Sequence, residues 1–154
     1  MSFPDTVPAS PGSAEVLRQT AFFHGLSREQ LERIALLGRV ETYPQDTSIY
    51  SLGQAADDFY VLVDGMVRFT IGLGNRSTHA GQVLRRGEVF GWAALVESAQ
   101  KRIATARAIT PCTVLALNGD QLTIMMDEDH ALGYRLMRQL NELITGNLTA
   151  FASG

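Results

Sequence analysis

The sequence predicts a mainly β fold, a sandwich or barrel with helices at both ends. Between about residues 39 and 118, short β-prone runs are separated by turn residues roughly every ten positions, a pattern unlike alternating βαβ units. On both sides of this region, apolar residues recur with the 3.6-residue period of amphipathic helices. The length of 154 residues fits one compact domain.

The composition describes a folded and mildly acidic chain. Apolar residues make up 45% and charged residues 19%, which is enough apolar surface for a core. Sixteen acidic against thirteen basic residues give a net charge of −3, which argues against a dedicated nucleic-acid-binding domain. The single cysteine, Cys112, excludes an internal disulfide and favours a reducing compartment. Since no apolar run approaches the ~20 residues that cross a bilayer and no secretory signal is visible, we expect a cytoplasmic protein without membrane contact.

The N-terminal part is expected to hold a leader and two helices. Three of the five prolines fall within residues 1–13, which indicates a flexible leader. A short helix is expected at about residues 14–20. Ser27 and Gln30 form a capping box, in which each side chain satisfies a backbone N–H of the other residue. The apolar stripe that follows predicts a helix ending near Gly38.

Residues 14–118 are expected to combine these helices with the β core. The runs 59–63 and 66–71 are joined by Asp64-Gly65, a dipeptide typical of two-residue hairpins because both positions tolerate positive φ. The other predicted segments are β-prone pieces around 40–43 and 49–50, a loop at 72–79, and strands near 80–85, 102–109 and 112–118.

Residues 119–154 are expected to form two helices of the same domain, a hinge and a lid or dimerisation helix. Asn118 and Gln121 resemble a second capping box, and a final helix runs from about residue 129 to at least residue 144. Its apolar residues form two stripes: Leu136, Leu140 and Leu143, and beside them Met137, Ile144, Leu148 and Phe151. A helix with two apolar faces needs two surfaces to pack on, so we expect a homodimer through residues 129–151. The alternative is a terminal helix buried more deeply in its own domain.

The stretch from residue 87 to residue 108 carries the candidate binding site. Gly91 allows a tight turn and a close approach to a ligand. Residues 93–95 favour a short helix, whose first turn offers unpaired N–H groups to an anion. Arg102 is expected to open the next strand, on the same face as two alanines. A guanidinium among small residues that faces a helix N-terminus suits bidentate contact with a phosphate.

This stretch resembles the phosphate-binding cassette of cyclic nucleotide-binding domains, which occur in catabolite-activator-type regulators, kinase regulatory subunits and cyclic-nucleotide-gated channels. The family pattern is Phe-Gly-Glu-x-Ala-Leu, a short spacer, then Arg, a small residue (Ala, Ser or Thr) and Ala. The positions to which the resemblance assigns ligand binding are Phe90, Gly91, Trp92, Ala93, Ala94, Leu95, Arg102, Ile103 and Ala104. Residues 23–27 and 59–67 also resemble the family's entry helix and leading hairpin, and the C-terminal helices its last two. The resemblance therefore covers nearly the whole chain and implies a β-roll, a double-stranded β-helix or jelly-roll barrel.

The resemblance implies a regulatory sensor domain. A phosphate-bearing small ligand, cAMP, cGMP or a related molecule, is captured by the cassette, and the last helix then closes over the pocket. The family's Glu, which binds the ribose 2′-hydroxyl, is replaced by Trp92, whose indole N–H only donates. Ile103 stands where the family often has a hydroxyl. The phosphate-binding parts are kept, so the sequence predicts an anion pocket with altered ribose recognition and no resident cofactor.

Two other functions stay open, and a third is not expected. The pocket can take a different small anion, or the domain can be a dimerisation module that binds nothing, with Trp92 filling the pocket and Glu88 or Glu97 pairing with Arg102. A small β-barrel enzyme is not expected, because no nucleophile–base pair appears and the three histidines lack metal-ligand spacing.

The family's transcription factors carry a DNA-binding helix-turn-helix after the long helix. This chain ends about where that domain begins, so we expect no specific DNA binding by it, whether it is a whole protein or a piece of a longer one.

Overall fold

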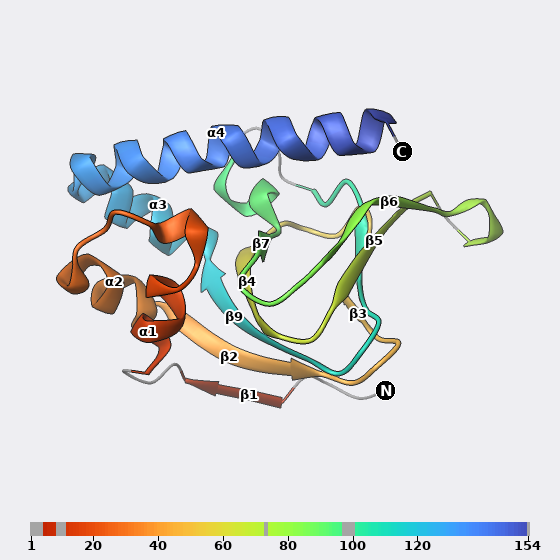
Figure 1. Ribbon diagram of the computed structural model, residues 1–154, viewed down its shortest axis with the longest axis horizontal. Coiled ribbons are helices and arrows are strands. Elements are labelled where there is room, and N and C mark those ends of the chain that lie inside the picture. Colours follow the sequence, from red (N-terminus) through yellow and green to blue (C-terminus); the bar gives the residue numbers. More distant parts are fainter. Residues whose placement is uncertain (1–4, 9–11, 73, 97–100, 154) are drawn as a thin grey trace.

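The computed structural model, which describes residues 5–8, 12–72, 74–96 and 101–153, confirms the predicted fold class. Two antiparallel sheets form a jelly roll, with helices gathered at one side (Figure 1). The five-stranded sheet has the order β1-β2-β9-β4-β7, with β1 (Asp5–Pro8), β2 (Gly38–Tyr43), β9 (Cys112–Asn118), β4 (Asp58–Asp64) and β7 (Val89–Phe90). The four-stranded sheet has the order β3-β8-β5-β6, with β3 (Ser48–Tyr50), β8 (Thr105–Ala108), β5 (Val67–Ile71) and β6 (Thr78–Leu84).

The helices precede and follow the roll in the sequence, but their buried residues share one core cluster with the outer face of the five-stranded sheet, and the longest helix also reaches β6 of the other sheet. They are α1 (Ser13–Arg18), α2 (Arg28–Ala35), α3 (Gly119–Glu128) and α4 (His130–Ser153), with short 3₁₀ turns η1 (Ala21–Phe23), η2 (Gly74–Arg76) and η3 (Trp92–Leu95). The longest, α4, runs along one side of the whole molecule (Figure 1). No helix in the described part of the chain is long and apolar enough to cross a membrane.

Alternation along the strands divides the core into two clusters. In β4, Phe59 and Val61 point to the helices, whereas Tyr60 and Leu62 point into the roll. All four side chains are buried, because the central strands of this sheet are covered on both faces. The cassette lies at the end of the roll next to α3 and contacts both clusters through Phe90 and Leu95.

The predicted hairpin at Asp64-Gly65 is wrong. The two strands it joins belong to different sheets, since β4 pairs with β7 and β9, and β5 pairs with β6 and β8. Only Gly65 has a positive φ, +100°, and a Cβ there would come within 2.5 Å of the Pro111 carbonyl oxygen. The dipeptide therefore forms a corner that crosses from one sheet to the other, where the absence of a side chain matters for packing.

The leader also differs in part from the expectation of a flexible segment. Residues 5–8 form β1, which pairs antiparallel with β2 at the edge of the five-stranded sheet. Pro8 ends this strand, as the edge position permits for a residue that has no N–H to donate.

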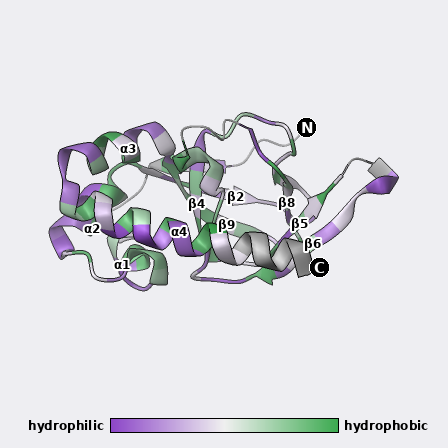
Figure 2. Cartoon of the chain, turned by 90° about the horizontal axis from the view of Figure 1, so that it is seen from above, coloured by the Kyte–Doolittle hydropathy of each residue, from purple (hydrophilic) through white to green (hydrophobic). Residues whose placement is uncertain are grey.

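The helix ends follow the predicted capping. Ser27 and Gln30 form the full capping box at the start of α2, and Asn118 caps α3 by accepting a hydrogen bond from the Gln121 amide. On α4, Leu136 and Leu140 are buried against the domain. The neighbouring stripe is divided: Met137 is 40% exposed, whereas Ile144 is partly buried against the core of its own domain. Figure 2 shows apolar and polar residues alternating around the helix. The stripe's predicted members Leu148 and Phe151 have side chains outside the described set.

Candidate ligand-binding site

The cassette begins with a left-handed turn at Gly91. Its φ is +80°, a conformation that glycine adopts without steric cost. A Cβ at this position would come within 3.0 Å of the Tyr60 ring and 3.1 Å of both the Arg102 guanidinium and the Asp58 carbonyl oxygen. The turn therefore brings the backbone close to Arg102 and leads directly into η3, the predicted short helix, which is a single 3₁₀ turn.

Arg102 is the central feature of the site. Arg102 is only 4% exposed. It lies in an irregular segment before β8, which begins at Thr105 and not, as predicted, at Arg102. The guanidinium donates from Nη1 to the Gly91 carbonyl oxygen at 2.9 Å and from Nη2 to the Asp58 carbonyl oxygen at 2.6 Å. It also lies 4.2 Å from the centre of the Tyr50 ring, an attractive cation–π position.

The charge of Arg102 lacks a carboxylate partner among the described residues. Its Nε is buried without a hydrogen-bond partner, and no ion pair forms with it in the part of the chain that the structure describes. Glu88, one predicted partner, is exposed and does not bond to it, and Glu97, the other, lies outside the described residues. A buried cation held only by carbonyl dipoles and an aromatic ring is a ready partner for an anion.

A second polar group on β2 and β4 supports the position of Arg102. Arg39 donates to the Asp58 carboxylate at 2.8 Å and to Glu41 at 3.2 Å, and the Tyr43 hydroxyl donates to Glu41 at 2.9 Å. These bonds, chiefly the one to Asp58, raise the pKa of Arg39 above its usual value. Because Asp58 binds Arg39 with its side chain and Arg102 with its backbone, the two guanidinium groups share one anchor.

The tyrosines around Arg102 stay protonated at physiological pH. Burial raises the pKa of Tyr50 to about 12, although the nearby Arg102 charge acts in the opposite direction. Burial likewise raises the pKa of Tyr60 far above its usual range, and nearby carboxylates add to this effect. The walls of the site are therefore neutral and aromatic, and Arg102 supplies its positive charge.

The cavity in front of Arg102 is small. Its volume is about 30 Å³, close to that of one water molecule. A nucleotide fits only if the walls of the cavity separate. The lining residues are Tyr50, Phe69, Leu84, Val89, Phe90, Gly91, Trp92, Ala93, Arg102, Ile103 and Ala104.

Most of the predicted positions meet at this cavity. Seven of the nine line it, and Ala94 and Leu95 do not, because η3 turns them toward α3 and the core. Sequence reasoning missed Tyr50, Phe69, Leu84 and Val89. They come from strands of both sheets, and their inward alternation was visible in the sequence, but their convergence depends on the path of the roll.

A larger groove adjoins the cavity on the side of α4. It has a volume of about 580 Å³ and shares three apolar lining residues with the cavity, Phe69, Leu84 and Val89. Its α4 wall is formed by Gln139, Glu142, Leu143 and Gly146.

The cassette touches α3, the helix that the sequence predicts to act as a hinge. The Gly119 amide, at the start of α3, donates to the Asp57 carbonyl oxygen at 2.9 Å. A Cβ on Gly119 would lie 2.2 Å from the Ala94 carbonyl oxygen of η3, so the two backbones are packed against each other. The last turn of the cassette and the first turn of the hinge are therefore in contact without an intervening side chain.

The comparison with known families agrees with this geometry. The family model of the cyclic nucleotide-binding domain matches residues 40–129, which contain the roll, the cassette and α3. The chain belongs to this family.

The described residues of this family member contain no group of three or more His, Cys, Asp or Glu side chains that could hold a metal ion.

Several relatives share the fold. Isozyme 1 of the cGMP-dependent protein kinase of Drosophila melanogaster is 35% identical over 101 residues, which is 64% of this chain but only 13% of the kinase. A cyclic nucleotide-binding-type protein of Geobacter metallireducens GS-15 superposes with a TM-score of 0.75 and 29% identity, covering 88% of this chain and 98% of that one. The regulatory domain of Toxoplasma gondii PKA, solved with cAMP, gives a TM-score of 0.70 at 21% identity over 89% of this chain and 48% of that one, and shows the shared fold alone.

Proposed function

We propose that this domain is a non-catalytic regulatory sensor that captures a phosphate-bearing small ligand, cAMP, cGMP or a related molecule, at Arg102. The observation that carries the proposal is the buried guanidinium, with an unpartnered Nε and no ion pair in the described part of the chain. Removing a charge from water costs several kcal/mol, and a bound anion offsets that cost. The phosphate of a nucleotide fits this role, since arginine binds it through two parallel hydrogen bonds.

The ligand's ribose is handled differently from the family pattern. Trp92 lines the cavity in place of the family's Glu, and the remaining lining side chains are apolar or aromatic apart from Tyr50 and Arg102. The cavity itself therefore has no carboxylate to accept a bond from the 2′-hydroxyl. This lining favours a second candidate, a small anion other than a nucleotide.

A third candidate follows from the small size of the cavity. About 30 Å³ is too little for a nucleotide without opening, which favours a domain that binds nothing and only dimerises. In that case Arg102 stays permanently bonded to the two carbonyl groups. This candidate ranks behind the sensor, because a domain that binds nothing leaves the buried Nε of Arg102 without a hydrogen-bond acceptor.

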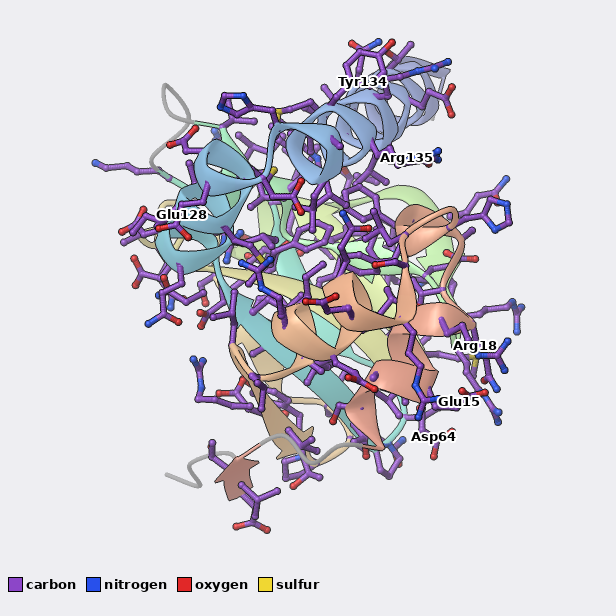
Figure 3. The ribbon with its side chains drawn as sticks, turned by 90° about the vertical axis from the view of Figure 1, so that its left-hand side faces the viewer. Glu15, Arg18, Asp64, Glu128, Tyr134 and Arg135 are labelled. Carbon is purple, nitrogen blue, oxygen red and sulfur yellow. The ribbon has the colours of Figure 1, made fainter. Side chains whose placement is uncertain are left out.

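We infer that the signal passes from the cassette to the C-terminal helices through the Gly119–Ala94 contact. A ligand that separates the walls of the cavity moves η3, and η3 packs directly on the first turn of α3. We propose that a homodimer forms through residues 129–151, on the side of α4 where Tyr134 and Met137 are 64% and 40% exposed. Figure 3 labels Tyr134 on this helix. Such a sensor acts in the cytoplasm, without specific DNA binding by this chain and without membrane contact.

Trp92 provides the test, because it is the only tryptophan and lines the cavity. We expect cAMP or cGMP to change its fluorescence in a saturable way, and inorganic phosphate to compete at higher concentration. Arg102→Met should abolish the response, and Arg102→Lys, which keeps the charge without the planar fork, should weaken it. Arg28→Met, at an exposed site on α2, is the matched control that should leave it unchanged. A wild-type protein that responds to no nucleotide contradicts the cyclic nucleotide proposal.

A further inference from the structure

One of the two sheets of this acidic chain has no acidic residue on any strand. Residues 65–87 and 98–119 contain no Asp or Glu, although the chain has sixteen acidic residues and a net charge of −3. These two segments supply β5, β6, β8 and β9. Because β3 consists of Ser, Ile and Tyr, all four strands of the β3-β8-β5-β6 sheet lack acidic residues.

The outward face of this sheet carries two arginines on neighbouring strands, with a histidine beside them. Arg68 on β5 and Arg107 on β8 are directly opposite each other, while their neighbours Phe69 and Ala106 pair on the inner face. Arg68 also donates to Nδ1 of His79 on β6 at 2.7 Å. We name Arg68, His79 and Arg107 the basic row. It crosses three adjacent strands, which lie about 4.8 Å apart.

Folding alone does not favour this arrangement. Like charges directly opposite each other on neighbouring strands are destabilising. Two other surface arginines, Arg18 and Arg28, pair with a carboxylate on their own helix. Among the described residues no ion pair forms with Arg68 or Arg107, and Asp46, in the turn before β3, is not bonded to either. The row thus holds uncompensated positive charge on a solvent-facing sheet.

We propose that the basic row is a docking surface for an acidic segment of a protein partner. Arginine forms bidentate bonds with carboxylates, so each of the two guanidinium groups can hold one acidic side chain of such a segment. The β5–β6 hairpin projects from the body, so a partner can approach this sheet freely (Figure 1).

Side-chain chemistry favours a peptide over other polyanions. The sheet's aromatic residues, Tyr50 and Phe69, line the inner cavity, so the described outer face offers no stacking platform for bases. Its outward pairs, such as Thr70 with Thr105, are polar and provide no apolar anchor for a lipid surface.

The test measures binding of a fluorescein-labelled heptaglutamate by fluorescence anisotropy. We expect saturable, salt-sensitive binding to the wild type, and about tenfold weaker binding, equal to about 1.4 kcal/mol, for Arg68→Gln/Arg107→Gln. The control Arg28→Gln/Arg33→Gln removes the same charge from exposed positions on α2 and should bind as the wild type does. Equal weakening of both double variants, or no binding by the wild type, overturns the proposal. Tighter binding of single-stranded DNA or of phosphatidylserine vesicles, lost in the same Arg68→Gln/Arg107→Gln variant, also overturns it.

Discussion

Replacing Gly119 by alanine tests the backbone contact between the cassette and the hinge. The new Cβ would lie 2.2 Å from the Ala94 carbonyl oxygen, whereas ordinary contacts begin at 3.4 Å. The two backbones must therefore separate by about 1 Å, and overpacking of this kind typically costs about 1–3 kcal/mol. Because Gly119 does not have a positive φ, backbone strain does not contribute to this cost.

Gly146 on α4 is the matched control. A Cβ there meets nothing within 4 Å, so Gly146→Ala should stabilise the protein by about 0.5–1 kcal/mol through helix propensity. Urea unfolding should then place the two variants about 1.5–4 kcal/mol apart, with Gly119→Ala the less stable. If Gly119→Ala is as stable as the Gly146→Ala variant, the cassette and the hinge are not packed as described and the proposed route of the signal loses its basis.

Three further predictions concern the helices. Ser27→Ala removes the side-chain cap of α2 and should cost about 1 kcal/mol in chemical unfolding; an unchanged midpoint contradicts the cap. Hydrogen bonds from Gln30 and the Leu132 amide hold the pKa of Asp129 below its usual value. Because this folded-state pKa is depressed, the stabilisation is present above about pH 4 and is lost as the pH falls further, and the acid loss of stability should be shallower in Asp129→Asn. Met137→Glu should convert a dimer into a monomer in light scattering after gel filtration, and a wild type that is already monomeric refutes the dimer.

The sequence predicts local structure well where neighbours in the chain determine it. The capping box at Ser27 depends on residues three positions apart, and the structure contains it. The Asp64-Gly65 corner shows the limit of such reasoning. Its composition is that of a hairpin turn, but the jelly roll sends the two flanking strands to different sheets, and the corner packs on Pro111, which lies far away in the sequence.

The candidate site shows the same division. Gly91 and Arg102 could be found from the sequence because they lie in one short motif, and they lie within bonding distance in the structure. The role of Asp58 could not be found, because it binds Arg102 through a backbone carbonyl that any residue possesses. The ring of Tyr50 over the guanidinium likewise depends on how the second sheet folds across the first.

The central claim is that Arg102 is buried in order to hold the anionic group of a ligand. The most direct measurement is thermal unfolding of the wild type and of Arg102→Met, with and without saturating cAMP or cGMP. At a ligand concentration of about 100 times Kd, binding adds about 2.7 kcal/mol, which raises Tm by about 5–10 °C for a chain of this size. We predict that shift for the wild type with at least one of the two nucleotides and none for Arg102→Met. An equal shift in both proteins, or no shift in the wild type with either nucleotide, contradicts the claim.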